Sequence, residues 1–172
     1  MPWDQAIAIV LFMSFPCLLV MAAFGDVASF RIPNTLNIAL ACLYLPTAIA
    51  AGSGLEIIAW HLGAGALVLV IGIILFALNW LGGGDVKLVA AAACWTGFAG
   101  LPGLLIFMAL AGGVLALVLL AVRRLLRDRI DRSSRFSRLL GQTRDVPYGV
   151  AIAIGSLMTM PNLDIFRSVF GL

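Results

Sequence analysis

Long stretches without a charged residue set the limits on how this chain can fold. They cover 5–25, 32–55, 88–122 and 146–163, and a further stretch, 57–84, is interrupted only by His61. A helix that crosses a bilayer needs about 20 consecutive apolar residues, so each stretch is a candidate membrane span. Of the 172 residues, 63% are hydrophobic and only 11% are charged, which excludes an ordinary soluble domain. We therefore expect an all-α integral membrane protein.

The stretch 88–122 is too long for one span, and it contains the helix-breaking cluster Gly-Phe-Ala-Gly-Leu-Pro-Gly at 97–103. Dividing it there predicts about six transmembrane helices in a single polytopic domain, 1–172. Their approximate bounds are 5–24, 35–51, 56–81, 86–99, 102–122 and 147–163. The fourth is short, because about 15 residues of helix rise only roughly 22 Å. Whether it crosses the membrane fully or re-enters is left open by the sequence.

The basic residues predict the orientation. Eight of the eleven lie in one loop, 123–145, which should stay in the cytoplasm under the positive-inside rule. Six spans then place both termini in the periplasm, and Arg31 and Lys87 fall on the cytoplasmic side with the loop. The same loop is suited to anionic lipid headgroups, so membrane lipids are expected partners. The eight residues are Arg123, Arg124, Arg127, Arg129, Arg132, Arg135, Arg138 and Arg144.

Two carboxylates, Asp26 and Asp85, lie at ends of apolar runs, 59 positions apart. An acidic residue at such a boundary is costly to keep, which points to a function. The predicted topology brings both to the cytoplasmic face, where they could share one water molecule as an aspartic protease requires. Placed at opposite ends of their spans, they would be about 30 Å apart and the hypothesis would fail.

Asp85 follows three glycines, Gly82, Gly83 and Gly84. Glycines leave space for another backbone to approach, as an extended peptide substrate would, so we predict that these three bind substrate. The structural alternative is a glycine turn that ends one helix, followed by Asp85 as the N-cap of the next. The motif by itself is compatible with both interpretations.

Two further segments lie on the same predicted face. Arg31-Ile32-Pro33-Asn34 follows Asp26. A short interfacial loop that starts the next helix explains Arg31, Pro33 and Asn34 well, but it explains Asp26 poorly. Asp145 precedes Pro147-Tyr148-Gly149, where it is the simplest N-cap of the last span, with a third acid as the alternative. Gly149 is expected to permit close helix packing.

The remaining polar and sulfur-containing residues predict no metal or cofactor. Cys17, Cys42 and Cys94 lie inside predicted spans without a CxxC spacing, and we expect them to be buried thiols. His61 and Glu56 are expected to form an interfacial pair away from the aspartates. The glycine run lacks the Lys-Ser/Thr ending of a phosphate-binding loop, and no nucleic-acid partner is expected.

Together and in this order, these segments resemble the prepilin peptidases, the GxGD family of membrane aspartic proteases. The resemblance rests on Asp26 with Arg31-Ile32-Pro33-Asn34, on Gly82-Gly83-Gly84-Asp85-Val86-Lys87-Leu88 and on Pro147-Tyr148-Gly149. It implies that Asp26 and Asp85 are catalytic and that the protein removes the leader peptide from a prepilin in the bacterial inner membrane. It implies no cofactor.

The chain lacks the cytoplasmic loop with paired CxxC motifs of the large bifunctional members, a region linked there to zinc and N-methylation. It looks like the short form that serves Flp-type, tight-adherence pili. Another GxGD-type protease, a proton or cation relay, and a pilus-assembly subunit are the alternatives. The oligomeric state, the prepilin cleaved, and which aspartate acts as base are left open.

Overall fold

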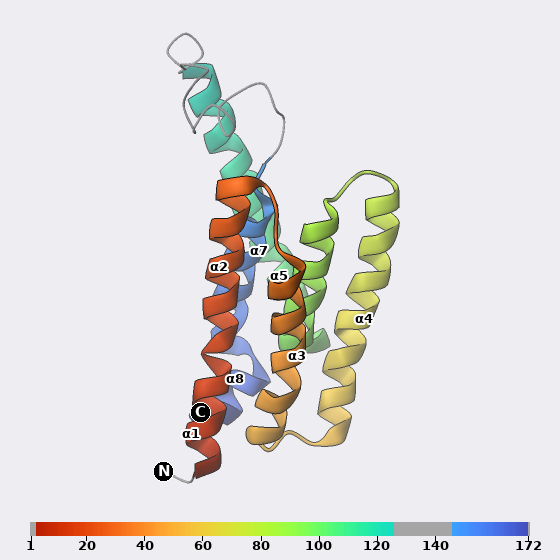
Figure 1. Ribbon diagram of the computed structural model, residues 1–172, viewed down its shortest axis with the longest axis vertical. Coiled ribbons are helices and arrows are strands. Elements are labelled where there is room, and N and C mark those ends of the chain that lie inside the picture. Colours follow the sequence, from red (N-terminus) through yellow and green to blue (C-terminus); the bar gives the residue numbers. More distant parts are fainter. Residues whose placement is uncertain (1–2, 126–145, 172) are drawn as a thin grey trace.

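The computed structural model describes residues 3–125 and 146–171, and their regular structure is helical throughout (Figure 1). This confirms the predicted all-α class. In chain order the helices are α1 (Trp3–Phe12), α2 (Ser14–Ser29), α3 (Asn34–Ala50), α4 (Leu55–Ala77), α5 (Gly83–Leu125), α7 (Tyr148–Thr159), the 3₁₀ turn η1 (Met160–Asn162) and α8 (Asp164–Phe170). The predicted basic loop lies outside the described residues, apart from Arg123 and Arg124 in the last turn of α5.

Three helical stretches are long and apolar enough to cross a membrane: Gln5–Ser29, Leu55–Ala77 and Gly83–Leu125. A fourth is added if the pair Tyr148–Asn162 and Asp164–Phe170, bent by 56°, counts as one span. The count of six predicted from sequence is therefore not confirmed. α3 is apolar but only 17 residues long, and the fourth and fifth predicted spans are two parts of α5. Helix α8 had no counterpart among the predicted segments.

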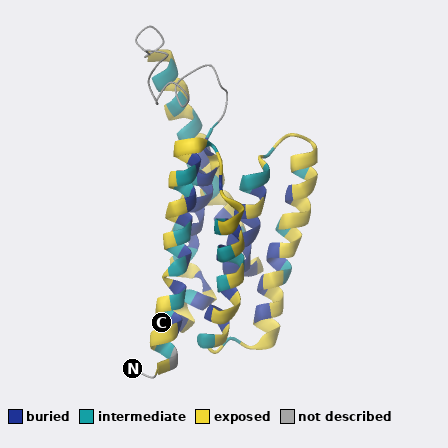
Figure 2. Ribbon diagram, in the orientation of Figure 1, coloured by how far each residue is buried: buried dark blue, intermediate teal, exposed yellow. Residues whose placement is uncertain are grey.

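The outward faces of the helices are exposed, as Figure 2 shows for α2 and α4, and the large side chains exposed there are apolar. On α4, the exposed large side chains include Leu67, Val70, Ile71 and Ile74, each between 45% and 57% exposed. Such a continuous apolar surface is unfavourable in water and suits the hydrocarbon core of a bilayer. The chain is therefore a membrane protein.

Gly97 divides α5 into two parts, 83–96 and 98–125. Its φ of 60° and ψ of −176° are not helical, and φ lies in the region that favours glycine. The chain turns back there, as Figure 1 shows, with the first part against α3 and α4 and the second against α7. In the second pairing Gly103 meets Thr159 and Gly112 meets Tyr148, so the two helices run antiparallel. A break within 97–103, as predicted, is confirmed.

Aromatic side chains fill the core at the end of the bundle where α1 and α8 meet. Trp95 is fully buried, stacks on Phe15 with ring centroids 4.8 Å apart, and donates from Nε1 to the Leu40 carbonyl at 2.8 Å. Phe12 contacts both of these rings and two rings of α8. This cluster joins α1, α2, α3, α5 and α8.

Two expectations about single residues are wrong. His61 is not interfacial: it is 6% exposed, lies parallel to the Tyr44 ring at 5.4 Å, and its Nδ1 is 3.0 Å from the Cys94 carbonyl oxygen. The chain reversal at Gly97 covers the His61 side chain, and the position of His61 in the sequence does not indicate this. Cys17 and Cys42 are exposed rather than buried, and only Cys94 lies inside the bundle.

Candidate active site

Asp26 lies in the last turn of α2, on the face that packs inside the bundle. The buried residues of this helix are Phe15, Leu19, Ala22 and Asp26, at intervals of four, three and four, so the carboxylate continues the core stripe. It is only 5% exposed. The helix ends at Ser29, and Phe30 after it takes a left-handed conformation and donates its N–H to the Asp26 carbonyl at 2.8 Å.

Gly149, in the first turn of α7, holds the Asp26 carboxylate. Its backbone N–H donates to Asp26 Oδ2 at 2.6 Å, a charge-assisted bond that spans 123 positions in the sequence. A Cβ on residue 149 would lie 2.9 Å from both Cβ and Oδ2 of Asp26. Only glycine allows the two backbones to come this close.

Asp85 lies in the first turn of α5 and is half-buried. The preceding glycine turn wraps around its side chain, because a Cβ on Gly82 would lie 2.8 Å from Asp85 Oδ2. The space left by the other two glycines is taken by the chain itself: Phe76 lies against Gly83, and Ile32 lies against Gly84. The structural interpretation of the motif, a glycine turn followed by Asp85 at the start of the next helix, therefore applies in this protein.

The two aspartates line one pocket of about 540 Å³. The three glycines line the pocket as well, so the structure brings together every residue predicted for the site. The rest of the pocket is lined by the segment between α2 and α3. The full lining is Asp26, Ser29, Phe30, Arg31, Ile32, Pro33, Asn34, Gly82, Gly83, Gly84 and Asp85.

Two hydrogen bonds tie the start of α3 to the start of α5, beside the pocket. Lys87 Nζ donates to Asn34 Oδ1 at 2.9 Å, and Asn37 Nδ2 donates to the Gly84 carbonyl at 3.4 Å. They link the segment that follows Asp26 to the segment that carries Asp85. The relative position of the two carboxylates therefore depends on α3 as well as on α7.

Sequence reasoning missed the roles of Gly149 and Asn37 in this site. Gly149 was expected only to permit helix packing. The one sequence feature that could have indicated its role is that Pro147-Tyr148-Gly149 lies on the same predicted membrane face as the two aspartates. Nothing local marked Asn37. Asp145, weighed as an N-cap or a third acid, lies outside the described residues.

Chemically, the pocket offers two carboxylates and the polar backbone around them. Two carboxyl groups close together do not both ionise readily, and such a pair can share one proton and act as acid and base on a bound water. Within 3–125 and 146–171, no three His, Cys, Asp or Glu side chains come together as metal ligands.

Comparison with known proteins gives one match. The family model of the type IV leader peptidase family matches residues 13–117, which is more than half of the chain and includes both aspartates. Neither a curated protein nor a solved structure matches significantly. Pro147-Tyr148-Gly149 lies beyond the matched residues, yet Gly149 contacts Asp26 directly. The chain belongs to the type IV leader peptidase family.

Proposed function

We propose that this protein is a membrane-embedded aspartic endopeptidase that removes the leader peptide from Flp-like type IV prepilins. The observation that carries the proposal is the shared pocket: Asp26 and Asp85, 59 positions apart, lie together at one end of a helical membrane bundle. Membership of the leader peptidase family supplies the reaction class and the kind of substrate.

In this mechanism one aspartate is ionised and takes a proton from a bound water, which attacks the carbonyl carbon of the scissile bond. The other aspartate is protonated, polarises the carbonyl oxygen, and the proton then passes to the leaving amine. The Gly149 N–H orients one oxygen of Asp26 and leaves the other for the water or the second carboxyl group. No cofactor takes part.

The reaction takes place at the cytoplasmic face of a bacterial inner membrane. Arg31 and Lys87 lie beside the pocket, and the second part of α5 ends in Arg123 and Arg124 on the same side of the bundle (Figure 1). Positive charge of this kind is retained in the cytoplasm. A precursor with a basic leader before an apolar helix would place its cut at this boundary.

The test is co-expression of the protein with Flp-type prepilins, read as the gel shift that follows loss of the leader. Wild type should cleave, and Asp26→Asn and Asp85→Asn should each abolish cleavage while still inserting in the membrane. Asp164→Asn, an exposed carboxylate on α8, is the matched control and should cleave normally. Cleavage by either pocket variant would rule out the two-aspartate mechanism, and no cleavage of any prepilin by wild type would rule out the substrate class.

A further inference from the structure

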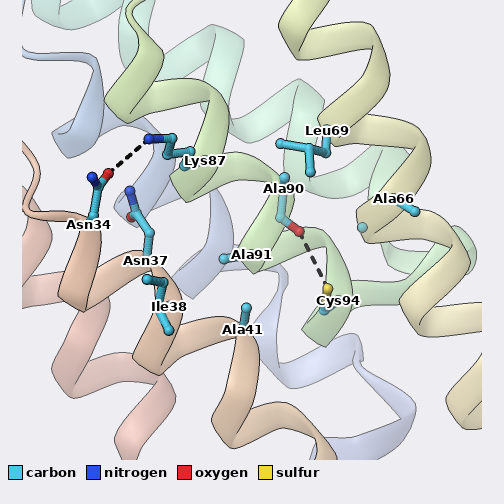
Figure 3. A pocket seen from close by; sticks show the side chains of 11 residues that line it. Asn34, Asn37, Ile38, Ala41, Ala66, Leu69, Lys87, Ala90, Ala91 and Cys94 are labelled. Carbon is cyan, nitrogen blue, oxygen red and sulfur yellow. Dashed lines mark hydrogen bonds between the residues drawn. The ribbon is translucent and has the colours of Figure 1, made fainter.

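A second pocket, of about 420 Å³, lies between α3, α4 and the first part of α5 (Figure 3). Its walls are formed by Ile38 and Ala41 on α3 and by Ala66 and Leu69 on α4, with Ala90 and Ala91 as the floor. It is open between the walls because α3 and α4 each pack on α5 but scarcely on one another. We call it the α3–α4 groove. Small residues along its floor allow another helix to approach closely.

The groove adjoins the aspartate pocket. Asn34 lines both, and its hydrogen bond to Lys87 forms the polar end of the groove, as Figure 3 shows. From this end the groove follows α3 as far as Ala41 and α5 as far as Cys94. Seven residues of helix rise about 10 Å, so the groove matches two helical turns. It runs from the proposed cleavage site into the apolar part of the bundle.

Asn37 adds an unused acceptor at the polar end of the groove. The residue is 4% exposed; its Nδ2 donates to the Gly84 carbonyl, but its buried Oδ1 has no hydrogen-bond partner. A buried acceptor without a donor is costly, and such groups in native proteins call for an explanation. The first turn of a helix carries backbone N–H groups that lack a partner within the helix. A helix that begins at this end of the groove would bring such N–H groups next to the Asn37 side chain, whose Oδ1 could accept from one of them after the side chain rotates.

We propose that the α3–α4 groove binds the apolar transmembrane helix of the precursor, with its first turn at Asn37 and its next turn along Ile38, Ala41, Ala66 and Leu69. This proposal rests on the proposed function and adds to it where the substrate lies. The leader would then extend across the aspartate pocket, and the bond between leader and helix would lie at Asp26 and Asp85. Binding of the helix in the groove orients the scissile bond, which a two-carboxylate site alone cannot do.

Photo-crosslinking tests the location directly. p-Benzoylphenylalanine is placed at Ile38 or Leu69, on the two walls, in the Asp85→Asn background so that the precursor stays uncleaved. The control position is Ile71, which is 47% exposed on α4 and does not line the groove. We expect adducts with the precursor from both wall positions and not from Ile71. Adducts only with lipid or with a second copy of this chain, or equal adducts from Ile71, would overturn the proposal.

Filling the groove tests its role in cleavage. Ala66→Trp should reduce cleavage at least about tenfold, mainly by raising KM, because the side chain occupies the space of the substrate helix. Leu67→Trp, at the neighbouring position and outside the groove, should cleave like wild type. If wild type cleaves no precursor, the proposed function fails. If wild type and Ala66→Trp cleave equally well, only the location in the groove fails.

Discussion

Asp26 shows how a single carboxylate can be kept in the interior of a membrane bundle. It occupies a position that continues the apolar core stripe of α2, where an ionised side chain without partners would be strongly unfavourable. The Gly149 N–H, which has no intrahelical partner in the first turn of α7, provides a hydrogen bond to it. The two groups satisfy each other, which ties the catalytic proposal for Asp26 to the Pro147-Tyr148-Gly149 motif.

Gly149→Ala should therefore impair cleavage without unfolding the protein. The added methyl group would lie 2.9 Å from Asp26 Cβ and Oδ2, so the carboxylate must move and the hydrogen bond is weakened. A hydrogen bond to a charged group contributes about 1.5–3 kcal/mol, which corresponds to roughly a tenfold to hundredfold loss of rate. The time course of prepilin cleavage measures this loss of rate.

Gly54→Ala is the control for this variant, because nothing lies within 4 Å of a Cβ at that position and the residue is at the other end of the bundle. It should cleave at the wild-type rate. Equal rates for the two variants would contradict a role of Gly149 in holding Asp26.

At the same scale, the sequence identified the acids and glycines of the site but not their partners. Asp26 and Asp85 stand out because charged residues are rare in this sequence, and the glycine turn stands out because three glycines are consecutive. Gly149 and Asn37 do not stand out, since their contacts cross 123 and 47 positions of sequence. No local pattern encodes a hydrogen bond of that range.

Among the elements, α5 has the largest effect on the architecture, because its break brings two functional parts together. The first part carries Asp85 and packs against α3 and α4, and the second supports α7 and thereby Gly149. The sequence predicted the break from a seven-residue cluster. Only Gly97 leaves the helical conformation, and Pro102 is accommodated inside the second part.

Gly97→Ala should destabilise the protein by more than the backbone strain that the substitution introduces. A residue with a Cβ in this backbone region, which is essentially restricted to glycine, costs about 1–3 kcal/mol. In addition, the new Cβ would lie 2.6 Å from Nε2 of the buried His61, which stacks on Tyr44 and has little freedom to move. We expect a clear decrease in the thermal unfolding temperature of the purified protein in detergent.

Gly52→Ala separates the two causes. Its φ of 74° also disfavours a side chain, but nothing lies within 4 Å of a Cβ there, so the unfolding temperature of this variant should fall less. An equal decrease in both variants would show that the contact with His61 does not matter.

Across the whole molecule, the aromatic cluster at the end away from the aspartates holds five helices together. Phe12 is fully buried at its centre, with ring centroids of Phe15, Trp95, Phe166 and Phe170 within 6.2 Å. Phe12→Ala should lower the free energy of unfolding by about 3 kcal/mol, since packing inside the bundle is lost. Val10→Ala, on the same helix and 72% exposed, should change it by far less. Unfolding by denaturant in mild detergent measures both, and equal effects would contradict the central role of Phe12.

Membrane orientation is the second prediction at this scale. Trp80, 74% exposed between α4 and α5, lies at the same end as Asp85, whereas Gly54 precedes α4 at the opposite end. In a background without Cys17, Cys42 and Cys94, a membrane-impermeant maleimide applied to intact cells should label Gly54→Cys. It should label Trp80→Cys only after permeabilisation. The reverse pattern would place the aspartate pocket in the periplasm and contradict the proposed topology.

The sequence by itself determined that this is a helical membrane protein with two acids at span ends, because run length, charge and helix-breaking residues are local properties. It did not determine the number of spans, since that depends on where helices bend. The tertiary structure alone decided that His61 is buried, that Gly149 binds Asp26, and that a groove opens between α3 and α4. The physical reason is common to all three: helices from distant parts of the chain pack side by side, and their contacts leave no periodic signal in any one segment.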